Sequence, residues 1–175
     1  YLDRHTSDKG IILLPCKISK DKIPPAAGAI TQQGQKAFYY IHSALLYAIL
    51  AMVGGVFYRE FTKCNDFTAK TTLSVIHTHY FLLGMVLFLL LLLLEKNFSF
   101  TNAKTGRILA VYHAGLNLTA VMLFVRGITQ VLVPALSSGI NAAISGVAGI
   151  GHILLGVSLI LLLIQIKHSV SALQS

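Results

Sequence analysis

Four long apolar runs account for most of the chain, and each ends at charged or turn-forming residues. They cover about residues 38–58, 71–94, 108–133 and 140–166, and Arg126 is the one charge that interrupts them. A bilayer core about 30 Å thick requires about 20 apolar residues in a helix, so each run predicts one transmembrane helix. Pro134 and Gly139 supply the turn between the last two. The pattern predicts an all-α integral membrane protein, a four-transmembrane-helix up-down bundle.

The two ends of the chain differ from this membrane domain, which covers residues 38–168. Residues 1–37 are polar and basic and show no helical or alternating apolar period, so we expect a tail. Because the chain begins at Tyr1 and not at methionine, this tail is a candidate for sequence foreign to the native protein. Residues 169–175 are expected to form a short C-terminal tail.

Composition and charge indicate the environment and the orientation. Hydrophobic residues make up 55% of the chain and charged residues 11%, against roughly 25% charged in soluble domains. Ten lysines and arginines lie on the side of the two termini and three on the opposite side, which predicts cytoplasmic termini in a bacterial inner (cytoplasmic) membrane. Anionic lipid then accounts for the net charge of +8. The expected partner is therefore the lipid bilayer and not nucleic acid.

Histidines inside the predicted helices are the main candidates for chemistry, because ionisable residues within a membrane are usually functional. We counted their depth at about 1.5 Å per residue from the helix ends on the side of the termini. His79 and His152, from the second and fourth helices, both lie roughly 21 to 22 Å deep. Two imidazoles at one depth can hold one iron, so this pair predicts the axial ligands of a b-type haem.

Four small residues share the helical face of His152, namely Ser145, Ala148, Gly149 and Gly156. Such a face suits either close helix packing or a flat macrocycle, and the sequence leaves both uses open. Arg126 lies roughly 27 Å deep, and no predicted helix contains a carboxylate to pair with it. We expect Arg126 either to lie beside haem propionates or to extend to helix-end carbonyls near Pro134.

His42 and His113 form a second, shallower layer, roughly 6 and 8 Å deep. Two interpretations remain open for them. They can hold a second haem, or His42 can face lipid headgroups while His113 joins a hydrogen-bond network with Asn117, four residues later. Other polar rings lie near the helix ends, where an interfacial aromatic belt is expected, namely Tyr39, Tyr40, Tyr58 and Tyr112.

His77 and His79 are two residues apart, so on a helix they point about 200° apart and cannot share one metal. Local unwinding of the second helix would let both join His152 in a copper or zinc site, since imidazole suits both metals. The remaining alternative is a cofactor-free membrane scaffold or partner subunit, in which the histidines only form hydrogen bonds between helices.

Several common catalytic motifs are absent from the sequence. It contains no glycine-rich phosphate loop, no paired carboxylates and no Cys-x-x-Cys motif, which argues against nucleotide enzymes, hydrolases and c-type cytochromes. A redox role stays open, and no catalytic residue is assigned.

Four segments carry a resemblance to a known family: residues 54–61 (GGVFYREF), 77–84 (HTHYFLLG), 125–127 (VRG) and 149–152 (GIGH). Together they resemble the bacterial four-span membrane family called domain of unknown function 2871, and the resemblance implies a four-helix membrane fold. The second segment, with its His-x-His and the leucines that follow, also resembles the haem-ligating helix of haem-copper oxidase relatives. We expect a membrane b-type haem-binding protein for electron transfer, haem handling or respiratory-oxidase assembly, partnered by a respiratory complex or a quinone.

Overall fold

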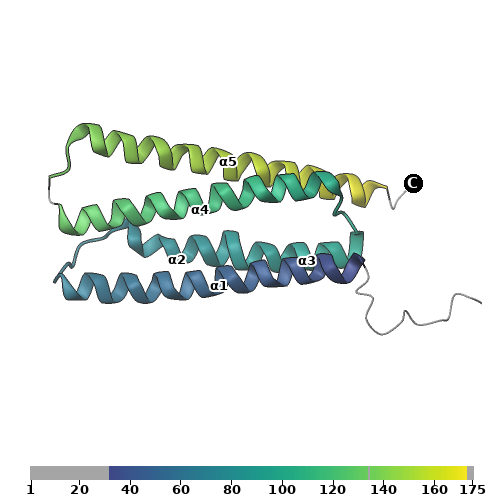
Figure 1. Cartoon of the computed structure of the whole chain (residues 1–175), viewed down its shortest axis with the longest axis horizontal. Coiled ribbons are helices and arrows are strands. Elements are labelled where there is room, and N and C mark those ends of the chain that lie inside the picture. Colours follow the sequence, from purple (N-terminus) through teal and green to yellow (C-terminus); the bar gives the residue numbers. More distant parts are fainter. Residues whose placement is uncertain (1–31, 134, 173–175) are drawn as a thin grey trace, which may run out of the picture. The chain divides into compact units, whose positions relative to one another are not determined.

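A computed structural model describes residues 32–133 and 135–172 of the chain, and this part is built from helices and loops. Four stretches are long and apolar enough to cross a membrane, which confirms the all-α, four-span fold. Figure 1 shows them running back and forth beside one another. The second stretch consists of four consecutive segments. The elements in chain order are α1 (Gln32–Cys64), η2 (Thr72–Val75), α2 (Ile76–His79), η3 (Tyr80–Val86), α3 (Leu87–Phe98), α4 (Ala103–Leu132) and α5 (Ser138–Ser171).

The helices extend beyond the predicted spans at several ends. α1 begins at Gln32, inside the predicted tail, because Lys36 donates to the Glu95 carboxylate at 3.1 Å and to the Thr101 carbonyl at 2.8 Å. These bonds hold the first turns of α1 against the end of α3. α5 continues to Ser171, past the predicted limit at residue 168. Residues 1–31 of the predicted tail lie outside the described part of the chain.

Many large apolar side chains are exposed on the outside of the bundle, as contact with lipid requires. In the most apolar window of each span, only 22% to 33% of the residues are buried. α1 packs along α2, η3 and α3, and α4 packs along α5. The centre holds large aromatic rings from three of the four spans, since Tyr40, Tyr47, Phe88 and Tyr112 are each at most 1% exposed. Tyr40 and Tyr112 therefore belong to the core and not to the expected interfacial belt.

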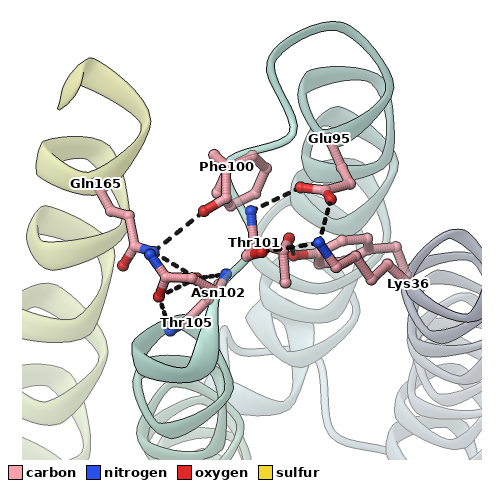
Figure 2. Close-up of polar contacts among 8 residues, drawn as sticks. Lys36, Glu95, Phe100, Thr101, Asn102, Thr105 and Gln165 are labelled. Atoms are coloured by element: carbon pink, nitrogen blue, oxygen red, sulfur yellow. Dashed lines mark hydrogen bonds and ion pairs between the residues drawn. The ribbon is translucent and has the colours of Figure 1, made fainter. Parts of the chain in front are cut away.

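A polar cluster joins all four spans at the end of the bundle nearest Lys36 (Figure 2). Glu95 is only 2% exposed, and it accepts hydrogen bonds from Lys36 and from the backbone N–H of Thr101, the latter at 2.8 Å. On the other side of the loop, Gln165 of α5 donates to the Thr105 hydroxyl at 2.6 Å. We call these five residues the end cluster.

Candidate cofactor site

The imidazoles of His79 and His152 meet between the second and fourth spans. Their ring centroids are 6.2 Å apart, and the ring planes are nearly perpendicular at 89°. His79 is the last residue of α2 and is half-buried, whereas His152 lies in the middle of α5 and is exposed on the surface that the bilayer would cover. Two residues 73 positions apart are thus brought into edge-to-face contact.

Backbone hydrogen bonds orient both rings in the same way. Nδ1 of His79 lies 2.8 Å from the carbonyl oxygen of Val75, and Nδ1 of His152 lies 2.8 Å from that of Ala148. Since a carbonyl only accepts, both Nδ1 atoms carry the proton and donate it. The lone pair of each neutral ring is then on Nε2, and among the described residues neither Nε2 has a hydrogen-bond partner. This tautomer is the one that a histidine ligand uses when its second nitrogen is held by a carbonyl.

The distance between the two rings fits a shared metal ion. A metal bound to two imidazole nitrogens at about 2.0 Å from each places the ring centroids roughly 6 Å apart. Open space surrounds the ring of His152 along α5, because a Cβ added at Gly149 or Gly156 would meet no atom within 4 Å. Both glycines share the face of His152, at three and four residues from it. The surface of α5 beside His152 is therefore open, which leaves room there for a flat macrocycle.

Arg126 is held across the gap between α4 and α5. Its Nη2 donates to the Asn141 side-chain oxygen at 2.7 Å and to the Ser145 hydroxyl at 2.6 Å. Ser145 lies on the face of His152, two helical turns or roughly 10 Å along the axis. These bonds use one of the guanidinium nitrogens, and Arg126 also lines a cavity of about 510 Å³ with Thr129. Arg126 thus bonds two side chains of α5 and not the helix-end carbonyls near Pro134 that the sequence suggested as one alternative.

His77 points away from this pair, as the helical spacing predicts. It lies against Gly54 and Gly55 of α1, and its Nδ1 is buried without a hydrogen-bond partner among the described residues. The second span stays helical around it, so His77, His79 and His152 are not brought together. Within residues 32–133 and 135–172, no group of three or more His, Cys, Asp or Glu side chains is placed to hold a metal ion.

The two shallower histidines, His42 and His113, have different surroundings. His42 stacks on Phe38 of its own helix, with ring centroids 3.7 Å apart, and is exposed. His113 is half-buried and has both ring nitrogens engaged, Nε2 with the Tyr39 hydroxyl at 2.8 Å and Nδ1 with the Tyr47 hydroxyl. Neither nitrogen of His113 is free for a second iron.

Asn117 extends the hydrogen bonds of His113 into a chain across three spans. Its side-chain N–H donates to the Tyr47 hydroxyl at 3.2 Å and to the His113 carbonyl at 2.8 Å, and its side-chain oxygen accepts from the Tyr80 hydroxyl at 3.2 Å. The sequence suggested the link between His113 and Asn117. It missed the three tyrosines, Tyr39, Tyr47 and Tyr80, because their partners lie on other helices.

A π-helical segment, η3 (Tyr80–Val86), follows directly after His79. Such segments widen the helix and leave a backbone carbonyl for another donor; here the Leu83 carbonyl accepts from the Tyr112 hydroxyl at 2.6 Å. Gly84 lets Tyr47 pack against the segment, since a Cβ there would lie 2.5 Å from the Tyr47 ring.

A family model described as "Protein of unknown function (DUF2871)" matches residues 38–169 of the chain. The match covers all four spans and therefore both histidines of the pair. No curated protein and no solved structure matches the chain, so the likeness of the second span to haem-copper oxidase relatives receives no support from them.

Proposed function

We propose that this chain, which belongs to the DUF2871 family of proteins of unknown function, is a membrane-bound b-type haem protein. His79 and His152 are the axial ligands in this proposal, and Arg126 lies near the propionates. The observation that carries it is the meeting of the two rings at 6.2 Å between centroids. The role would be electron transfer, haem handling or respiratory-oxidase assembly, with a respiratory complex or a quinone as partner.

Each residue of the site has a separate task in this proposal. The carbonyls of Val75 and Ala148 accept from the Nδ1 N–H groups of the two rings, which leaves Nε2 of each ring to bind the iron. Gly149 and Gly156 leave room for the macrocycle. Arg126, whose hydrogen-bond partners among the described residues are both neutral, supplies a positive charge for the propionates. A bound haem supplies reversible one-electron chemistry.

The proposed membrane and orientation rest on the charge distribution. We place the protein in the bacterial inner membrane with both termini in the cytoplasm, because lysine and arginine favour that side ten to three, and still five to three when the residues before Lys36 are left out. In this orientation His79 and His152 lie toward the outer leaflet.

An absorption spectrum of the purified protein, oxidised and reduced, tests the proposal. We expect a Soret band and the sharp visible bands of a low-spin haem with two histidine ligands. His79→Ala and His152→Ala should each remove or convert this spectrum, whereas His42→Ala, which changes an exposed ring on α1, should leave it intact.

Two other results would select the alternatives. Stoichiometric copper or zinc without a haem spectrum would indicate the alternative copper or zinc site of His77, His79 and His152. A colourless, metal-free protein, even after haem supplementation, would leave a cofactor-free scaffold or partner subunit, in which His152→Asn is tolerated.

A further inference from the structure

A cavity of about 410 Å³ lies between the first turns of α1 and α4. Lys36 and Tyr39 line it from α1, Leu109 lines it from α4, and the ring of Tyr40 forms part of its wall. Its volume is within the range of small-molecule sites. The cavity lies at the end of the spans, where an amphiphile in the bilayer would keep its polar head. It is far along the bundle from His79 and His152, so it is separate from the proposed haem site.

The hydrogen-bond chain through His113 has a direction, which follows from its buried members. Asn117 donates to the Tyr47 hydroxyl oxygen. Tyr47 is 1% exposed, so its own hydrogen needs an acceptor, and Nδ1 of His113 is the one within reach. The neutral ring of His113 then carries its proton on Nε2 and donates it to the Tyr39 oxygen at 2.8 Å.

This direction leaves the hydroxyl hydrogen of Tyr39 as the outermost donor of the chain, on a residue that lines the cavity. The Tyr39 hydroxyl also bonds the Ser43 hydroxyl. Because Ser43 can be the donor of that bond, the hydrogen of the Tyr39 hydroxyl can still be donated to a ligand. Donation by His113 polarises the Tyr39 hydroxyl and strengthens its next hydrogen bond. The hydroxyl of Tyr40, in contrast, is already bonded to the Thr101 hydroxyl at 2.6 Å.

We propose that this cavity binds the headgroup of a membrane quinone, with the Tyr39 hydroxyl donating to a quinone carbonyl. A quinone headgroup is flat, uncharged and rich in acceptors, so it suits a cavity walled by two tyrosine rings and edged by neutral amide donors, those of Gln32, Gln35 and Asn102. The inference rests on the proposed function for the class of its ligand, since it gives the quinone partner a site. It does not require that haem be bound.

The charge of the cavity favours a quinone over a phospholipid headgroup. A phosphate would be held by an unpaired cation, but the Lys36 ammonium already pairs with the Glu95 carboxylate at 3.1 Å and donates to the Thr101 carbonyl. Lys36 therefore contributes little net positive charge to a ligand. The other polar side chains that line the cavity are neutral, namely Gln32, Gln35, Tyr39, Tyr40, Thr101 and Asn102.

Photolabelling in lipid nanodiscs prepared without natural quinones tests the site. The probe is an azido-benzoquinone with a decyl tail, and the parent decyl-benzoquinone is the competitor. We expect saturable labelling of peptides that contain Tyr39 or Leu109. Tyr39→Phe should weaken the competitor about tenfold, the effect of losing one directed hydrogen bond. Tyr58→Phe is the control, because it removes a hydroxyl near the other end of α1, outside the cavity, and it should change the affinity by no more than about twofold.

Three results would overturn the inference: labelling that does not saturate, equal losses of affinity in Tyr39→Phe and Tyr58→Phe, or labelling that phosphatidylglycerol displaces and decyl-benzoquinone does not. The same measurement on His79→Ala protein separates this inference from the haem proposal. Retained affinity there would support the quinone site even if the purified protein proves to lack haem.

Discussion

At the scale of single residues, the orientation of the two imidazoles is decided by the backbone of their own helices. A histidine whose Nδ1 donates to the carbonyl four residues earlier is fixed in rotamer and tautomer before any ligand arrives. Val75 and Ala148 do this for His79 and His152. Binding of a metal then needs little further ordering of these two side chains. The main remaining requirement for a haem is space beside the rings.

Gly149→Leu should therefore reduce haem content severalfold without unfolding the protein. A side chain at this position enters the open space beside His152 and meets no atom within 4 Å at its Cβ. Gly146→Leu is the matched control, because Gly146 has the same open surroundings but lies on a different face of α5 from His152. The haem-to-protein ratio of the two purified variants checks this. Equal haem in both would argue against a macrocycle on the Gly149 face.

The sequence identified the histidine pair because the depth of a residue in the membrane depends mainly on its position along its own helix. In an up-down bundle with short loops, counting residues gives the depth of His79 and His152 without any knowledge of packing. The partners of His113 were not accessible in this way, since Tyr39 and Tyr47 come from α1 and their contact depends on how the helices are rotated. The hydrogen bond from Arg126 to the Asn141 side chain was missed for the same reason.

At the scale of elements, α4 and α5 approach so closely that glycine is required at their contact. A Cβ at Gly151 would lie 2.6 Å from the Thr119 hydroxyl oxygen and 2.9 Å from the Thr119 backbone nitrogen. Packing of this kind is the main source of helix association in lipid.

Gly151→Ala should lower the free energy of unfolding by about 1 to 3 kcal/mol, the usual cost of overpacking. Gly146→Ala is the same substitution on the same helix at an open position. It should raise stability by about 0.5 to 1 kcal/mol, because alanine loses less conformational entropy in a helix than glycine. Reversible unfolding in mixed micelles measures both. The opposite signs are the test, and a loss of stability in both variants would contradict the packing argument.

The π-helical segment marks the limit of prediction for the second span. Its residues, Tyr80–Val86, are apolar and continuous with their neighbours, so the hydrophobic pattern predicts one regular helix. The segment depends on contacts from other spans, namely the Tyr112 hydroxyl on the Leu83 carbonyl and the Tyr47 ring on Gly84. The existence of the span was predictable, and its internal geometry was not.

At the scale of the whole molecule, the end cluster holds the spans together around a buried carboxylate. Lys36→Met should cost about 3 kcal/mol, because it leaves the Glu95 charge without its partner. The double variant Lys36→Met/Glu95→Gln should recover at least about 1 kcal/mol of this loss, since glutamine is neutral and still accepts from the Thr101 N–H. Lys96→Met, at an exposed neighbouring position, is the control and should be neutral. A double variant no more stable than Lys36→Met would show that the unpaired charge is not the cause.

The orientation of the whole bundle can be tested with the exposed cysteine that ends α1. Cys64 lies at the other end of α1 from Lys36, and the orientation proposed above would put it outside the cell. In a Cys16→Ser background, a membrane-impermeant maleimide should label Cys64 in intact spheroplasts. Ser171→Cys in the same background without Cys64, at an exposed position near the end of α5, should react only after lysis. The reverse labelling pattern would show that the topology is inverted. The His79 and His152 pair would then lie in the cytoplasmic leaflet, and any electron donor would have to reach it from that side.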